Sequence, residues 1–235
     1  MDVDLGAVKG AATPDLARCA AGAAANAQGL LDDAEVLSAA ARPARAYALA
    51  VLAVEEAGKA ASLACLAVMP GGLRARAPVG RMLEWHQLKL VGGMLIAAVP
   101  LGTTPTMAAQ LTAMAPSQLT EVLDNARALA QDQDHLKQRG MYADMDCGGR
   151  VRLPSEVTDA DVASQLRQAR RAVSSASVLL DPRAPAFLAN PPPEVAEFCR
   201  ALVGALAKGG YGRTPQAAAD VWLNAVDKLR QQTRA

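Results

Sequence analysis

The chain of 235 residues carries 24 basic and 23 acidic side chains, so its formal net charge is +1 and no global field directs it onto nucleic acid. Hydrophobic residues make up 51% of the chain and aromatic residues only 3%, with alanine prominent. Alanine has the best helix propensity and lets helices approach closely, so this composition predicts an all-α fold. The length is sufficient for one large helical domain or for a domain with a small appendage.

We expect residues 1–12 to form a loose leader and the first helix to begin at Thr13, where Thr-Pro-Asp is a helix-start pattern. Apolar residues then recur with the 3.6-residue period of one helix face as far as about Ala41. Asn26 lies among the alanines of this helix. We interpret it as a hydrogen-bonded core amide, and a functional amide is the alternative.

The second helix, between Pro43 and Pro70, is apolar on nearly every side, which indicates a central position in the bundle. The short joint before it predicts antiparallel packing on the first helix. Glu55, Glu56 and Lys59 lie at its middle, with the lysine within one turn of both carboxylates. We favour a buried ion pair, or clip, that fixes the packing of this helix against the next helix. A polar functional site is the alternative.

The third expected helix, over about 79–99, carries His86, one of only two histidines. Arg81 precedes it by five residues and Lys89 follows by three. An arginine that binds phosphate and a histidine that moves a proton near neutral pH are the groups that metal-independent RNA cleavage needs. Five residues on a helix separate two side chains by about 140°, so a shared site requires a bent first turn or two chains. A hydrogen-bonded core histidine is the alternative.

The fourth expected helix runs from about 117 to 139, and Gly140 follows it at a position typical of a helix C-terminal cap. Asp132, His135 and Arg139 near its end are spaced three and four residues apart. We interpret this charged run as a solvated face. An aspartate-oriented histidine close to an arginine is the alternative, and it makes this group the second candidate for proton transfer.

Residues 140–154 contain a Gly-Gly pair between short alternating segments and predict a small hairpin or ordered loop. A fifth helix is expected over about 158–180, opened by Thr-Asp-Ala-Asp. The proline-rich stretch 182–193 predicts a surface connection, and two more helices are expected at about 194–208 and from 214 onward.

The four cysteines are widely separated and include no CxxC pair, which argues against a zinc or thioredoxin-type site; they are Cys19, Cys65, Cys147 and Cys199. All but Cys147 lie in apolar helical patterns, so we interpret those three as small core residues. We expect no metal and no cofactor. No signal peptide is visible, and the uncharged run 90–101 is too short to cross a bilayer, so we expect a reduced cytoplasmic protein without a membrane segment.

Four sequence elements now stand together in order. They are Asn26 with Leu30-Leu31 and Ala34, Glu55-Glu56-x-Gly58-Lys59, His86-x-x-Lys89, and Lys137-x-x-Gly140-Met141-Tyr142-Ala143-Asp144 followed by Pro154. In this order and spacing, over roughly residues 13–180, the chain resembles the AbiV-type abortive-infection family of the HEPN-like superfamily. The Glu-Glu-x-Gly-Lys and Gly-x-Tyr-x-Asp elements are its more specific matches. Tyr142 and Asp144 therefore join the glutamates and lysines as a candidate polar site.

The repeated caps and apolar stripes predict an all-α bundle of about six or seven helices. The resemblance implies that residues 13–180 form a HEPN-like helical domain, and we expect residues 181–235 to be a helical extension packed on it. It also implies a homodimer that limits phage propagation by metal-independent RNA cleavage or translation shutdown. By the resemblance, His86 would be the general acid/base and Arg81 would hold the phosphate. The alternative is a non-catalytic helical binding module that senses or sequesters a phage or host protein.

Overall fold

The computed structural model describes residues 5–69, 71, 83, 86, 89, 90, 92, 93, 133, 136–138, 140–145, 148–191 and 193. Its α-helices are α1 (Leu5–Gly10), α2 (Thr13–Ala39), α3 (Pro43–Val68), α9 (Asp159–Ala176) and α10 (Ala184–Ala189). Two short 3-10 helices, η1 (Pro154–Glu156) and η2 (Ser177–Leu180), and two strands, β1 (Asp144–Met145) and β2 (Val151–Arg152), complete these elements. The all-α prediction is confirmed, and the small antiparallel hairpin lies where residues 140–154 predicted it.

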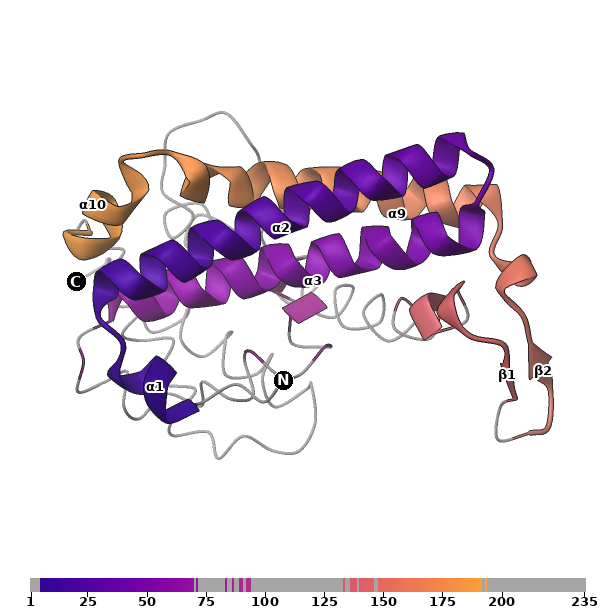
Figure 1. Ribbon diagram of the computed structural model, residues 1–235, viewed down its shortest axis with the longest axis horizontal. Coiled ribbons are helices and arrows are strands. Elements are labelled where there is room, and N and C mark those ends of the chain that lie inside the picture. The colour runs from indigo at the N-terminus through magenta and orange to yellow at the C-terminus, as the bar shows by residue number, and fades with distance from the viewer. Residues whose placement is uncertain are drawn as a thin grey trace, which may run out of the picture.

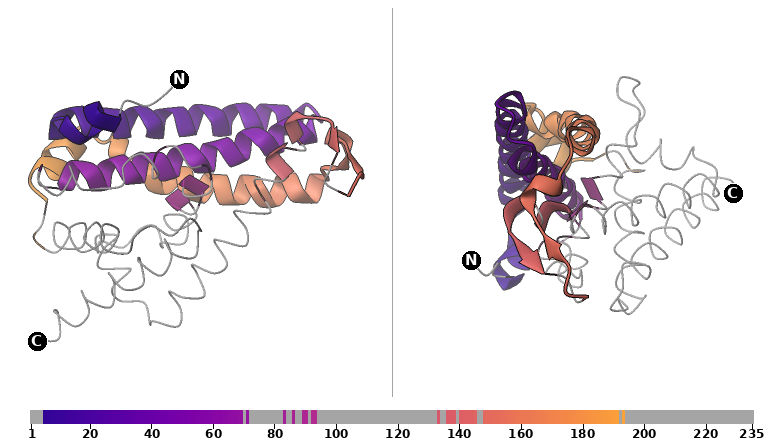
Figure 2. Two further views of the ribbon diagram at one scale, coloured as in Figure 1. Left: turned by 90° about the horizontal axis from the view of Figure 1, so that it is seen from below. Right: turned by 90° about the vertical axis from the view of Figure 1, so that its right-hand side faces the viewer.

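The long helices α2, α3 and α9 run lengthwise side by side and form the body of the bundle (Figures 1 and 2). The middle helix, α3, packs against both α2 and α9, and more than half of its residues are buried. Most of them are alanine and valine, which let the neighbouring helices approach closely. The central position predicted for this helix is therefore confirmed.

A tight turn reverses the chain between α2 and α3. The backbone N–H of Arg42 donates to the Leu37 carbonyl at 2.9 Å, and that of Ala41 donates to the Ser38 carbonyl at 3.1 Å. This is the bonding pattern of a Schellman cap, with Ala41 in the left-handed region at a φ of 53°. At the other end of α2, the Thr13 hydroxyl donates to the Ala67 carbonyl of α3, and the N-cap is Ala12 rather than the threonine.

Two side chains of α2 that we predicted to be buried are exposed. Cys19 and Asn26 are seven residues apart, so they share one face of the helix, and that face is turned to solvent. The interpretation of Asn26 as a core amide is wrong for this reason. Cys65, in contrast, is partly buried against the core as expected, while Cys147 and Cys199 lie outside the described residues.

The helix predicted to open at Thr158 is confirmed as α9. The Thr158 hydroxyl accepts from the Asp161 backbone, and the Asp161 carboxylate accepts from the Thr158 backbone, so the two form a capping box. The last turn before Asp181 is the 3-10 helix η2.

Two short helices lie in segments that we predicted as irregular. The expected loose leader contains α1, whose Val8 packs against the core, and the expected surface connection 182–193 contains α10, whose Leu188 is buried. Both helices are only six residues long, so tertiary contacts rather than local propensity stabilise them. The helices predicted at 194–208 and from 214 onward lie outside the described residues. Within the described part of the chain, no helix is both long and apolar enough to cross a membrane.

Candidate functional site

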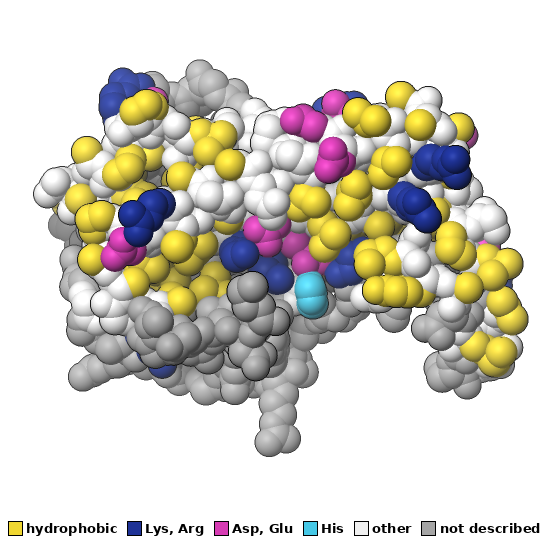
Figure 3. Space-filling model, viewed as in Figure 1, with side chains coloured by type: hydrophobic (Ala, Val, Ile, Leu, Met, Phe, Trp, Pro, Cys, Tyr) yellow, Lys and Arg dark blue, Asp and Glu magenta, His cyan; other side chains and the backbone are white. Residues whose placement is uncertain are grey.

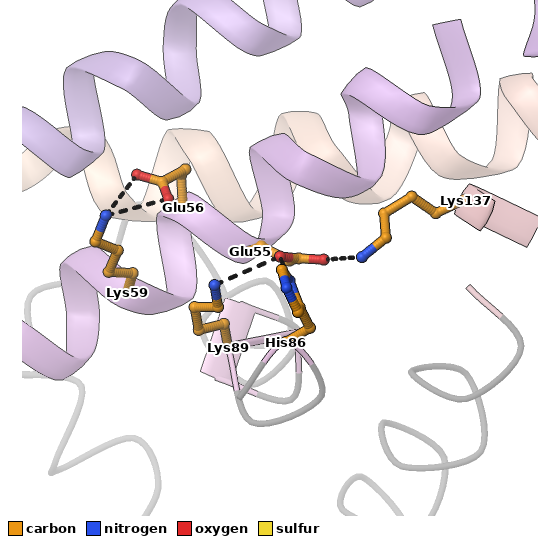
Figure 4. Close-up of polar contacts among 6 residues, drawn as sticks. All are labelled: Glu55, Glu56, Lys59, His86, Lys89 and Lys137. Carbon is orange, nitrogen blue, oxygen red and sulfur yellow. Dashed lines mark hydrogen bonds and ion pairs between the residues drawn. The ribbon is translucent and has the colours of Figure 1, made fainter. Parts of the chain in front are cut away.

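A buried carboxylate at the middle of α3 gathers three partners from distant parts of the chain. Glu55 is only 2% exposed, and its Oε1 accepts a hydrogen bond from Lys137 Nζ at 2.7 Å. Its Oε2 lies 2.6 Å from His86 Nδ1 and 3.7 Å from Lys89 Nζ (Figure 4). We call these four residues the Glu55 cluster.

Glycines bring the 83–93 segment against α3. The described residues of this segment are helical, and a Cβ on Gly58 would overlap the backbone carbonyl of Lys89. Likewise, a Cβ on Gly93 would overlap the carbonyl of Val54. The two backbones therefore touch directly, and this contact, three residues from Glu55 along α3, places the histidine and lysine of the segment at its carboxylate.

A third glycine brings in the segment that carries Lys137. A Cβ on Gly140 would overlap the carbonyl of Ala44 near the start of α3. Gly140 is helical and Tyr142 N–H donates to the Gln138 carbonyl at 2.9 Å, so the prediction that the helix stops before this glycine is wrong. The glycine is needed for close approach rather than for a left-handed cap.

His86 combines an oriented nitrogen with an exposed ring. Its side chain is 58% exposed, whereas the carboxylate that it contacts is buried. An ionised carboxylate can only accept, so Nδ1 carries the proton of this hydrogen bond, and Nε2 bears the lone pair of the neutral ring. The arrangement yields an accessible base at Nε2 and a fixed ring orientation.

The Glu55 cluster has more positive than negative charge. A carboxylate this buried requires compensation, and Lys137, only 4% exposed, supplies it at 2.7 Å. Lys89 adds a second positive charge, so the three groups sum to +1 before any proton is added to His86. On the surface, both basic and acidic side chains lie beside the imidazole, which is drawn in cyan (Figure 3).

The predicted clip of two glutamates around one lysine is only partly confirmed. Lys59 pairs with Glu56 at 3.3 Å, as a three-residue spacing permits, but its side chain is 35% exposed. Glu55 turns instead to the cluster across the helix interface (Figure 4). The polar group in α3 is therefore two separate ion-pair systems, and only the one around Glu55 is buried.

The remaining candidates lie elsewhere or outside the described residues. Tyr142 is exposed, and Asp144 opens β1 in the hairpin that projects at the end of the bundle (Figure 1). Four candidates lie outside the described residues, so their roles stay predictions: Arg81, Asp132, His135 and Arg139.

The interpretation of the charged run near residue 135 as a solvated face is wrong for two of its residues. Gln133 and Lys137 are buried, and they are four residues apart, so they share the inward face of the helix. Gln133 donates to the Gln168 side chain of α9, while Lys137 reaches Glu55. The role of Lys137 was missed because its partner lies 82 residues away. The only signal was its place in the element that ends in Gly-x-Tyr-x-Asp.

Long packed helices around a buried carboxylate and an exposed, oriented imidazole define a helical-bundle protein with a preformed polar site. The chain belongs to the AbiV family of HEPN proteins: the HEPN_AbiV family model, described as AbiV, matches residues 15–174. That range includes every member of the Glu55 cluster. The family connects the chain with abortive infection and phage defence. No curated protein and no solved structure matches the chain.

Proposed function

We propose that this AbiV-family protein defends against phage in the cytoplasm as a metal-independent endoribonuclease, with His86 as its proton-transfer group. One observation carries the proposal: the exposed imidazole is held at Nδ1 by a buried carboxylate, which leaves Nε2 as an accessible base. Imidazole suits this task because it gains and loses a proton near neutral pH.

In the proposed reaction, His86 Nε2 takes the proton of a ribose 2′-hydroxyl. The 2′-oxygen forms a bond to the adjacent phosphorus while the bond from phosphorus to the 5′-oxygen breaks. The departing 5′-oxygen takes a proton from water, and the imidazolium returns its proton to water. The products are a 2′,3′-cyclic phosphate and a 5′-hydroxyl, and Arg81 is proposed to neutralise the phosphate during the step.

The test is RNA cleavage by purified protein in EDTA, compared among wild type, His86→Ala and His135→Ala. We expect His86→Ala to lower the rate by roughly 10²- to 10⁴-fold, the usual contribution of a general acid/base, while His135→Ala retains activity. Product ends should be cyclic phosphate and 5′-hydroxyl. Cleavage that survives loss of His86 but not of His135 would move the site to the 132–139 segment.

We also propose that the active form is a homodimer. Arg81 and His86 are five residues apart in the sequence, and an ideal helix separates two side chains at that spacing by about 140°. A second chain is therefore the simplest source of the missing group. Light scattering at micromolar concentration tests this. A monomer would count against both the dimer and a site shared between chains.

A second candidate function is a binding module for a phage or host protein. It is favoured by a group of exposed apolar side chains on and beside the hairpin: Met141, Tyr142, Met145, Val151 and Leu153. Clusters of this kind mark interaction surfaces. If purified wild type cleaves no RNA and is not toxic on expression, this function becomes the better one, and the Glu55 cluster is then structural.

A further inference from the structure

Lys89 is a buried cation without a hydrogen bond among the described residues. Its side chain is only 11% exposed, and its nearest anionic atom, Glu55 Oε2, is 3.7 Å from Nζ, beyond hydrogen-bond length. An ammonium has three donors, and buried donors are almost always satisfied. This donor set is therefore available to a ligand that reaches the cluster.

Glu55 does not depend on Lys89 for its compensation. Lys137 already contacts Oε1 at 2.7 Å, and His86 contacts Oε2 at 2.6 Å. Lys89 is thus a surplus positive charge in a largely desolvated place. A buried charge of this kind is unfavourable until an anion binds to it and compensates it. It also follows His86 by three residues on one helical segment, so the two side chains lie on the same face.

We propose that Lys89 is a phosphate-binding residue of this site and contacts a backbone phosphate of RNA beside His86. The identity of the ligand as RNA rests on the proposed function, whereas the anion site rests on the geometry of the cluster. When the phosphate arrives, the ammonium moves from Glu55 to the phosphate oxygens. Lys137 keeps the carboxylate compensated during that exchange, so His86 stays oriented.

The probe is a 2′-O-methyl oligoribonucleotide, which has the phosphates of RNA but no 2′-hydroxyl to attack. Its binding to the full chain is measured by fluorescence anisotropy over a range of salt concentrations. Lys89→Met should weaken binding roughly tenfold or more, as for loss of a charged hydrogen bond. It should also reduce the slope of log K against log salt by about 0.7, the value for one phosphate contact on a single strand.

The matched control is Lys59→Met, which removes a lysine of α3 that lies outside the cluster and whose side chain is 35% exposed. It should change affinity by less than about twofold, because its charge is screened. Lys89→Arg should retain most of the affinity. Equal affinity and slope for wild type and Lys89→Met would overturn the proposal, and so would failure of wild type to bind the probe.

A measurement on wild type covers the case in which Lys89→Met does not fold. The side-chain NMR signal of Lys89 should shift on saturation with the oligonucleotide, and an unmoved signal would refute the contact. The two proposals fail separately. RNA cleavage with Lys89-independent binding refutes only the phosphate contact, whereas Lys89-dependent binding without cleavage refutes only the ribonuclease.

Discussion

Two lysine–glutamate pairs lie near the middle of α3, and they differ mainly in the burial of their side chains. Lys137 and Glu55 are 2.7 Å apart with side chains 4% and 2% exposed. Lys59 and Glu56 are 3.3 Å apart with side chains 35% and 18% exposed. Replacing each lysine in turn by methionine keeps most of the apolar stem and removes only the charge.

We expect Lys137→Met to lower the free energy of unfolding by about 3 kcal/mol. Loss of one partner of a buried pair costs about 3–5 kcal/mol because it leaves an uncompensated charge. The lower end applies here since Lys89 and His86 remain near Glu55. Lys59→Met should cost less than about 1 kcal/mol, as is usual for exposed pairs.

Urea unfolding followed by circular dichroism measures both values at pH 7. In thermal unfolding, a loss of about 3 kcal/mol lowers Tm by roughly 6–12 °C in a chain of this length. If Lys137→Met costs no more than Lys59→Met, the reasoning about Glu55 is refuted.

Three further predictions concern the backbone and an exposed pair. Gly58→Ala should destabilise the protein by at least about 2 kcal/mol, since the new Cβ would overlap backbone atoms. Gly22→Ala should stabilise the protein by roughly 0.5–1 kcal/mol, because nothing lies within 4 Å of the new Cβ. Equal effects of the two substitutions in urea unfolding would contradict the close contact at Gly58. Ala41→Gly should raise stability by about 1 kcal/mol by relieving the left-handed φ of 53°, and an unchanged unfolding midpoint would count against this. The side-chain hydrogen bond from Arg183 lowers the pKa of Asp181 to about 2, so the contribution of this carboxylate to stability is present above about pH 4 and is lost as the pH falls toward 2. An NMR titration midpoint near the ordinary aspartate value would refute that shift.

Local sequence signals were sufficient for the long elements. Proline at the start of α2 and α3, the Thr158 capping box and the 3.6-residue apolar stripes each act within one or two turns. The short helices α1 and α10 were missed, because six residues do not form a stable helix without the packing of Val8 and Leu188.

Alanine-rich periodicity left the buried face of α2 ambiguous. Cys19 and Asn26 lie among alanines, and alanine is compatible with both core and surface. The exposed position of both side chains follows from where α3 and α9 pack, which is a property of the assembled bundle.

The sequence by itself determined a helical bundle of the AbiV family, a central α3, and His86, Lys89 and Glu55 as residues to consider. Helical spacing allowed Lys59 to pair with either neighbouring glutamate, because both lie within one turn. Only the tertiary structure decided that Glu55 faces His86 and Lys137, which are 31 and 82 residues away. The physical reason is that glycines at the helix contacts let the backbones touch, and the carboxylate buried there must find its compensating charge on the neighbouring segments.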